Sequence, residues 1–182
     1  MQIIILPGNN ISNQTWGELV RDYYGPQFTS VHLVEYEHWV TGAPAIDFDV
    51  ELVKLREREQ PLFTDEPTVV VAKSAGALLA FVAVEEGVLQ PSASIFFGIP
   101  FAMAAEDIFK DDWTAVSNFS IPGLAFHNRQ DPTADYRYTQ AVLAEYAPQI
   151  KLITTAGDDH WYGDFSEYDE AIQHALTTNV AI

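Results

Sequence analysis

The chain contains no cysteine, and this absence excludes disulfide bonds, thiolate catalysis and cysteine-based zinc sites. Long hydrophobic runs are also missing, and none reaches the roughly 18 residues that a membrane-spanning helix needs. The N-terminal stretch MQIIILPGNN lacks the basic start and the longer apolar segment of a signal peptide. We therefore expect a cytoplasmic protein whose first residues form a strand.

Basic residues are scarce: 9 lysines and arginines stand against 26 aspartates and glutamates, and the formal net charge is −17 at pH 7. A surface of this sign repels the phosphate backbone of nucleic acids and anionic lipid headgroups. Neither nucleic acid nor membrane is therefore expected as a partner. Solubility accounts for the acidic surplus, which indicates no particular ligand.

The rest of the composition is that of a globular protein, with 48% hydrophobic and 19% charged residues over 182 positions. This length suffices for one domain with a substantial core. Short β-branched or aromatic runs alternate with longer stretches of helical spacing. The predicted strands are 2–6, 31–36, 68–72, 93–97, 122–127 and 150–154, and the predicted helices are 13–24, 48–59, 75–87, 103–110, 135–146 and 166–178.

This alternation predicts a single α/β domain, 1–182, with about six strands in a mostly parallel sheet and helices on both faces. The nearly continuous apolar runs VVV and SIFFG are typical of central strands, and the mixed stretch VHLVEYEH suits an edge strand. In helix 48–59, Val50, Val53 and Leu55 are expected to share the apolar stripe. Because such sheets bind ligands at the carboxyl ends of their strands, catalytic residues should lie directly after strands.

Ser74 lies at the join of a strand and a helix, in VVVAKSAGALLA. The segment Ala72-Lys73-Ser74-Ala75-Gly76 resembles the G-x-S-x-G nucleophile elbow, with alanine in place of the first glycine. The elbow needs small residues two positions before and after the serine, and both are small here. Its serine hydroxyl would lie exposed at a helix N-terminus, where the Ala75 amide points at a developing oxyanion. The same residues fit an ordinary serine N-cap equally well, and Lys73 is expected to point away from the site.

His160 is the candidate general base, because it follows the last predicted strand in the polar loop TTAGDDHWYGD. The other four histidines lie in or beside the edge strand, in strand 122–127 and in the last helix: His32, His38, His127 and His174.

Asp131 is the candidate carboxylate that orients the imidazole, because it follows strand 122–127 in HNRQDPTADY. A turn-forming aspartate before proline is the alternative interpretation. Asp135 is better placed as the N-cap of the next helix. Asp158 and Asp159 rank lower, since closeness to His160 in the sequence does not aim a carboxylate at its ring.

Ser74, Asp131 and His160 occur in the order Ser…Asp…His, each after a predicted strand, and this is the order of α/β-hydrolases. The chain as a whole resembles that superfamily. It looks most like small, single-domain serine hydrolases of the retinoblastoma-binding-protein type, which similarly open with a strand, a Pro-Gly turn and a Trp-containing helix, here IIILPGNNISNQTWGEL. The resemblance implies an α/β-hydrolase fold, a triad of these three residues, and an oxyanion hole formed by the backbone amides of Asn9 and Ala75.

The two dozen or so residues between strands 93–97 and 122–127 leave no room for the cap domain that larger relatives insert there. We therefore expect an open, shallow site for small or surface-presented substrates, with modest activity on short-chain model esters. Asn10 and Trp161 are weaker candidates for its lining. The chain has no H-E-x-x-H, Walker or dinucleotide-binding motif, so neither a metal nor a cofactor is expected.

The leading hypothesis is a serine hydrolase that cleaves small carboxylic esters or related acyl compounds through an acyl-enzyme on Ser74. Two alternatives stay open: a non-catalytic binding or scaffold protein that retains the hydrolase fold, and a flavodoxin-like domain in which Ser74 only caps a helix. The sequence does not distinguish esters from thioesters, amides or acyl transfer, and it leaves the oligomeric state open.

Overall fold

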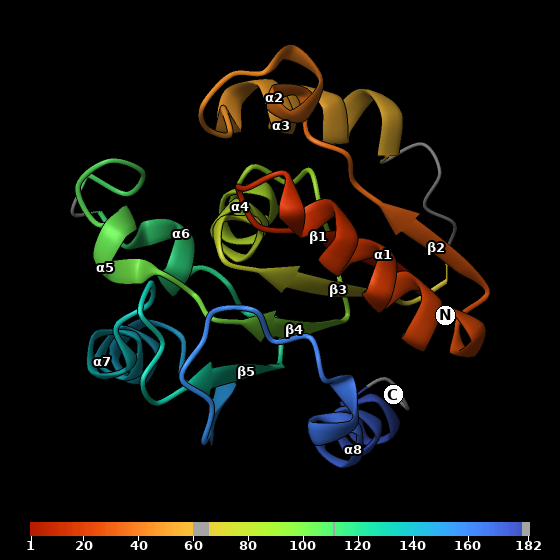
Figure 1. The fold of residues 1–182 in the computed structure, drawn as a ribbon, viewed down its shortest axis with the longest axis vertical. Coiled ribbons are helices and arrows are strands. Elements are labelled where there is room, and N and C mark those ends of the chain that lie inside the picture. Colours follow the sequence, from red (N-terminus) through yellow and green to blue (C-terminus); the bar gives the residue numbers. More distant parts are fainter. Residues whose placement is uncertain (60–65, 111, 180–182) are drawn as a thin grey trace.

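The computed structural model describes residues 1–59, 66–110 and 112–179. They form one six-stranded sheet in the order β2-β1-β3-β4-β5-β6 (Figure 1), and every neighbouring pair of strands is parallel. The predicted sheet is thus confirmed. Its strands are β1 (Gln2–Leu6), β2 (Ser30–Leu33), β3 (Thr68–Lys73), β4 (Ala93–Phe97), β5 (Gly123–Asn128) and β6 (Ile150–Thr155).

Helices cover both faces of this sheet, as expected. One face packs against α1 (Ser12–Tyr24) and α8 (Asp169–Asn179). The helices on the other face are α3 (Phe48–Lys54), α4 (Ala75–Glu85), α5 (Phe101–Ala104), α6 (Thr114–Ser117) and α7 (Tyr136–Tyr146). The remaining short helical segments are α2 (Glu37–Thr41), Gly25–Gln27, Leu55–Glu59 and Phe165–Glu167. No helix in the described part of the chain has the length and apolarity to cross a membrane.

Central and edge strands lie where the sequence predicts them. β3 and β4 are buried along their whole length, whereas β2 is only half-buried at the edge. Because side chains alternate along a strand, each central strand contributes to two cores. Ile4, Val70 and Phe96 belong to one core, and Ile3, Val69 and Ile95 to the other.

The edge strand is shorter than predicted, because β2 ends at Leu33 rather than at Tyr36. The Val34 amide still donates to the Ile5 carbonyl at 3.0 Å, but the Tyr36 hydroxyl donates to the Pro7 carbonyl at 2.8 Å. The chain therefore leaves the sheet to cover the loop after β1. It then forms α2, which the sequence analysis did not predict.

The predicted apolar stripe of helix 48–59 is correct for Leu55 but wrong for Val50 and Val53. Val50 and Val53 are 40% and 49% exposed, while Leu52 and Leu55 pack toward the core. The buried Glu51 side chain explains the rotation, because its carboxylate accepts the Glu37 amide at 2.6 Å. This bond holds α3 against α2 with the two valines facing solvent.

The helix predicted at 103–110 is wrong, since α5 ends at Ala104. Irregular turns follow it, and Lys110 has a φ of 50°. Phe101 and Phe109 both pack against the ring of Trp113, at 5.6 Å and 5.1 Å between centroids. This aromatic packing overrides the local helical preference.

Gly76 marks the closest approach of α4 to the sheet. A Cβ atom there would lie 2.1 Å from the Leu6 carbonyl oxygen and 2.3 Å from that of Pro7. Alanine is the better helix former by about 1 kcal/mol, so without this contact Gly76→Ala would stabilise the protein. We expect it instead to lower the free energy of unfolding by about 1–3 kcal/mol, as measured by urea denaturation. An unchanged or higher stability would contradict the close packing.

Candidate active site

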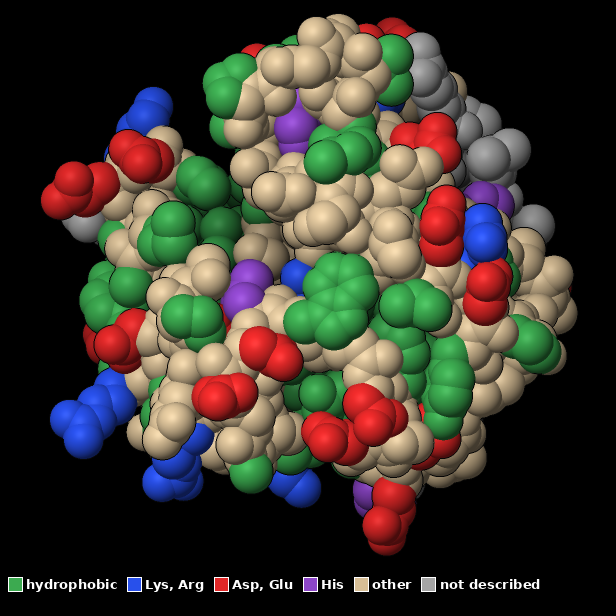
Figure 2. Space-filling view, in the orientation of Figure 1, with side chains coloured by type: hydrophobic (Ala, Val, Ile, Leu, Met, Phe, Trp, Pro, Cys, Tyr) green, Lys and Arg blue, Asp and Glu red, His purple; other side chains and the backbone are tan. Residues whose placement is uncertain are grey.

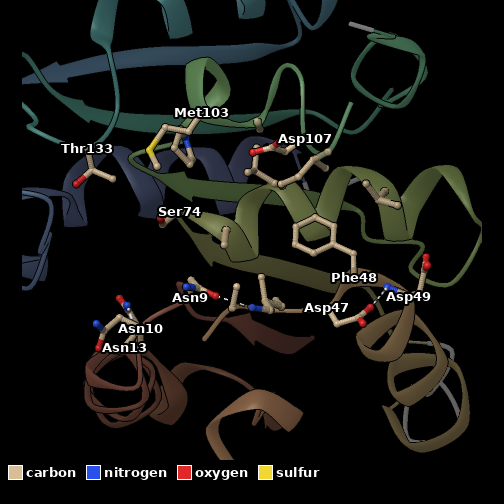
Figure 3. A pocket seen from close by; sticks show the side chains of 18 of the residues that line it. Asn9, Asn10, Asn13, Asp47, Phe48, Asp49, Ser74, Met103, Asp107 and Thr133 are labelled. Atoms are coloured by element: carbon tan, nitrogen blue, oxygen red, sulfur yellow. Dashed lines mark hydrogen bonds between the residues drawn. The ribbon is translucent and has the colours of Figure 1, made fainter. Parts of the chain in front are cut away.

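Loops at the carboxyl ends of four strands surround one cavity of about 850 Å3, a volume within the usual range for small-molecule sites. Asn9 and Asn10 follow β1, Ser74 follows β3, Thr133 follows β5, and His160 follows β6. Figure 3 shows Ser74 and the labelled asparagines facing this space. Helix α3, which the sequence analysis did not place at the site, contributes Phe48, Asp49 and Leu52 to the lining.

Ser74 has a strained backbone, with φ 54° and ψ −124°. A non-glycine residue in this conformation costs on the order of 1–3 kcal/mol. The Ser74 amide donates to the Phe97 carbonyl at 2.9 Å, which fixes the turn between β3 and α4. Its side chain makes no capping hydrogen bond to the helix, so the geometry differs from that of an ordinary serine N-cap.

His160 and Asp131 are in direct contact. The His160 Nδ1 atom lies 2.7 Å from Asp131 Oδ2. The other carboxylate oxygen, Oδ1, accepts the amides of Thr133 and Ala134 at 2.8 Å and 2.9 Å. The carboxylate is thus held by the turn that it forms, and both of its oxygens are engaged.

The Asp131 carboxyl stays ionised in this environment. Its burial alone would raise its pKa, but the hydrogen bonds from His160, Tyr162 and the Ala134 amide outweigh that effect and lower the pKa below its ordinary value. Because an ionised carboxylate only accepts, the His160 Nδ1 atom carries the proton of the neutral ring. The Nε2 atom is then free to accept a proton.

Gly98 lets the imidazole approach the sheet. Its φ is 54°, and a Cβ atom there would lie 2.9 Å from His160 Cε1 and 2.7 Å from Tyr162 Cε2. The His160 Nε2 atom is buried and has no hydrogen-bond partner among the described residues. His160 and Ser74 line the same cavity, but no hydrogen bond joins their side chains in the described structure.

Tyr162 was missed by the sequence analysis, although its hydroxyl contacts the same Asp131 oxygen as His160. Its hydroxyl donates to Asp131 Oδ2 at 2.6 Å and accepts the Asn128 amide at 3.0 Å. The residue is 2% exposed and has a φ of 53°. No sequence pattern indicates that a tyrosine two positions after a histidine adopts a left-handed backbone conformation. Only the structure therefore reveals this contact.

Removal of the Tyr162 hydroxyl is expected to destabilise the protein. Tyr162→Phe leaves the buried Asn128 amide without its acceptor, which should lower the free energy of unfolding by about 1–3 kcal/mol. Tyr23→Phe is the matched control, because it also removes a hydroxyl–carboxylate bond, to Asp169, but at a residue that is 41% exposed. Urea denaturation of both variants tests the difference, and equal losses would contradict the role of the buried bond.

The loop after β1 is held by α2 and by the segment that follows it. The Asn9 carbonyl accepts hydrogen bonds from His38 Nε2 at 2.6 Å and Trp39 Nε1 at 2.9 Å. The Asn9 side-chain oxygen accepts the Ile46 amide at 2.6 Å. No hydrogen bond to the amides of Asn9 or Ala75 is found within the described ranges. Both amides of the predicted oxyanion hole therefore belong to cavity-lining residues and are free to donate.

Lys73 is not among the residues that line the cavity, and it is 2% exposed. Its ammonium group donates to Asn13 Oδ1 and lies 5.8 Å from the ring centroid of Trp16 and 5.5 Å from that of Trp161. Trp161 is thus not among the residues that line the cavity, whereas Asn10 and Asn13 are. No group of three or more side chains suited to a metal ion is found in the described part of the chain.

The buried Lys73 predicts a pH dependence of stability. Burial lowers the pKa of Lys73 from 10.5 to about 8, against the attraction of Asp131 and Asp159. Between pH 8 and pH 10.5 Lys73 is therefore protonated in the unfolded chain and largely neutral in the folded protein. The free energy of unfolding should rise with pH across this range by on the order of 3 kcal/mol. Urea denaturation near pH 7 and near pH 10 should show this rise in the parent protein relative to Lys73→Met. A pH-independent difference between the two would contradict the shift.

Solved structures of hydrolases share this fold at low sequence identity. A YdeN-like hydrolase of Pectobacterium atrosepticum superposes with a TM-score of 0.69 at 16% identity, over 98% of this chain and 90% of its own. A hydrolase of the α/β superfamily from Xanthomonas campestris pv. campestris superposes with a TM-score of 0.62 at 14% identity, over 96% of this chain and 95% of its own. Est1E of Butyrivibrio proteoclasticus, solved with bound ferulic acid, superposes with a TM-score of 0.69 at 16% identity, over 100% of this chain and 90% of its own. No protein-family profile and no curated protein sequence matches the chain.

These superpositions show that the chain has the α/β-hydrolase fold. The predicted fold class is therefore confirmed. At such identities the comparisons establish the fold alone, because one fold supports many functions. The narrower likeness to the retinoblastoma-binding-protein type and the roles of the site residues stay predictions.

Proposed function

We propose that the protein is a serine hydrolase that cleaves carboxylic esters or related acyl compounds. Ser74 is the nucleophile, His160 the general base and acid, and Asp131 the carboxylate that orients His160. One observation carries the proposal: His160 is fixed by Asp131 through Nδ1, and its unpartnered Nε2 belongs to a residue that lines the same cavity as the strained Ser74. The ferulic acid bound to Est1E, one of the superposed structures, is a carboxylic acid, the kind of product that ester cleavage releases, and this supports the choice of an ester.

The reaction follows from the protonation states of these groups. His160 Nε2 takes the Ser74 hydroxyl proton while Oγ bonds to the carbonyl carbon of the substrate. The carbonyl oxygen becomes an oxyanion, which the amides of Asn9 and Ala75 stabilise. The bond to the alcohol then breaks, and Nε2 returns the proton to the departing oxygen. Asp131 stays ionised throughout and stabilises the imidazolium that forms in each step.

Water completes the cycle by the same route. His160 Nε2 takes a proton from the water molecule as its oxygen attacks the acyl carbon. The tetrahedral intermediate collapses, the bond to Ser74 Oγ breaks, and Nε2 protonates that oxygen. The products are a carboxylic acid and the alcohol, and the enzyme returns to its starting state without a cofactor.

Covalent labelling with a fluorophosphonate tests the nucleophile. The parent protein should be labelled at one site, Ser74→Ala should not be labelled, and His160→Ala should react at least about 100-fold more slowly. Ser117→Ala, at an exposed serine outside the cavity, should behave as the parent. Equal labelling of the parent and Ser74→Ala would exclude Ser74 as the nucleophile. A parent protein that is not labelled would favour a binding or scaffold protein.

A further inference from the structure

The cavity has two chemically different halves. Asn9, Asn10, Ser74, Thr133 and His160 make one half polar. Apolar side chains from α3, α4 and the segment after Pro100 line the other half, on both sides of the gap between them. They include Phe48, Leu52, Leu78, Val82, Met103 and Ile108.

The labelled residues show how the lining is arranged. In Figure 3, Thr133, Met103 and Ser74 lie toward one end, Phe48 is farther along, and Asp49 marks the far end. Figure 2 shows a hollow with hydrophobic side chains between the part of the molecule formed by α2 and α3 and the part formed by α5. The apolar half is therefore a groove that starts at Ser74, and we call it the α3–α4 groove.

We propose that the α3–α4 groove binds the acyl chain of the substrate, and that this chain is a neutral alkyl chain of medium length. This inference rests on the proposed function, and the direction of the reaction assigns the groove to the acyl side. The departing alcohol receives its proton from His160, so it must leave on the side of His160. Thr133, whose amide holds Asp131, lies on that side of Ser74. The groove runs the opposite way (Figure 3), where the acyl part remains.

The lining of the groove selects for chain length. Met103 is 64% exposed, and Phe48, Leu52 and Val82 are half-buried. An alkyl chain would cover this apolar surface. Each methylene that becomes buried should raise kcat/KM by up to about fourfold, because the chain stays in place in the transition state. A short acyl group such as acetate leaves most of the groove unused.

The charges along the groove select against an acidic chain. Asp49 and Asp107 are exposed and line the groove together with one cation, Lys110. The carboxylate of Asp47 is already used, since it accepts the Asp49 and Val50 amides as the cap of α3. A carboxylate at the tip of the substrate chain would approach two like charges, which disfavours it at low salt.

A chain-length series with matched variants tests the groove. We expect the parent protein to hydrolyse p-nitrophenyl octanoate with a kcat/KM at least about tenfold above that of the acetate ester. In Leu52→Trp the added ring fills the groove, and the octanoate-to-acetate ratio should fall at least tenfold. Val53→Trp is the control, since Val53 is the next residue of α3 and is 49% exposed outside the cavity, so the ratio should not change.

Further measurements keep the result independent of folding. Thermal melts establish that each variant is folded, and Val82→Trp, from the opposite wall, should lower the same ratio. A p-nitrophenyl ester with a terminal carboxylate should be hydrolysed more slowly than the neutral ester at low salt, and Asp49→Asn with Asp107→Asn should reduce this difference. The proposal that the groove binds the acyl chain would be overturned if kcat/KM did not depend on chain length. It would also be overturned if Leu52→Trp and Val53→Trp had the same octanoate-to-acetate ratio.

Binding separates the groove from the proposed function. Calorimetry with Ser74→Ala should detect p-nitrophenyl octanoate more tightly bound than the acetate, and Leu52→Trp in that background should remove the preference. If hydrolysis depends on Ser74 but shows no chain-length preference, the acyl-binding role of the groove is overturned and the proposed function stays supported. If octanoate binds preferentially but no hydrolysis depends on Ser74, the proposed function is overturned and the acyl-binding role of the groove stays supported.

Discussion

Asp131→Asn is expected to lower kcat/KM for a short-chain ester by about 10³–10⁴-fold. The asparagine oxygen can still accept the amides of Thr133 and Ala134, which hold Oδ1 in the parent. Its amino group then takes the place of Oδ2 and donates toward His160. Nδ1 of His160 can accept a hydrogen bond from that amino group only when it carries no proton, so the proton of the neutral imidazole moves to Nε2. With Nε2 protonated, His160 cannot accept the hydroxyl proton of Ser74.

The neighbouring carboxylates provide the control for this prediction. Asp158 and Asp159 lie in the same acidic loop as His160, but the ring contact goes to Asp131. Asp159 instead accepts the Trp161 amide at 2.8 Å. Asp158→Asn removes the same charge and should change kcat/KM by less than about threefold. Equal losses in Asp131→Asn and Asp158→Asn, measured by steady-state kinetics on folded variants, would mean that charge and not orientation matters.

The sheet was predictable from the sequence because its strands carry their own signal. The runs around Val70 and Phe96 are apolar without interruption, and only a strand with a core on each face uses every position in this way. The order of Ser74, Asp131 and His160 was also readable, since each follows a strand and parallel strands end at one edge. These are short-range patterns, which one sequence contains in full.

The walls of the cavity were not predictable, because tertiary contacts decide them. The rotation of α3 about its axis depends on the hydrogen bond from the Glu37 amide to the Glu51 carboxylate. No local sequence pattern links these two residues. The segment after Ala104 has helical spacing, but Phe109 packs on Trp113 and the helix ends. The expectation of an open, shallow site considered only the region where larger relatives carry a cap, and it did not include the residues that α3 adds to the lining.

The segment that forms the wall also holds the loop of the proposed oxyanion hole. His38 and Trp39 donate to the Asn9 carbonyl, and Ile46, which lines the cavity, donates to the Asn9 side chain. These bonds hold the carbonyl and the side chain of Asn9, and with them the Cα atom to which the Asn9 nitrogen is attached. The Asn9 N–H lies in the preceding peptide plane, so we expect these contacts to position it through the backbone of Asn9, and His38 and Trp39 are positioning residues in the proposed mechanism.

Loss of these two donors is expected to lower kcat rather than to raise KM. A double variant, His38→Ala with Trp39→Phe, leaves the Asn9 carbonyl without both side-chain bonds, and kcat should fall by about 10–100-fold, less than the loss of an entire oxyanion donor. KM should stay within about twofold, because the amide binds the oxyanion only in the transition state.

Two comparison variants separate positioning from a general effect on the fold. His38→Gln, with Trp39 intact, keeps an amide donor for the Asn9 carbonyl and should retain more of kcat than His38→Ala. Val40→Ala, at a 78% exposed residue of the same helix, should have the kinetics of the parent. If KM rises while kcat is unchanged, the two residues act on the wall of the cavity and not on the amide. If His38→Gln is as slow as His38→Ala, the bond to Asn9 does not position the loop.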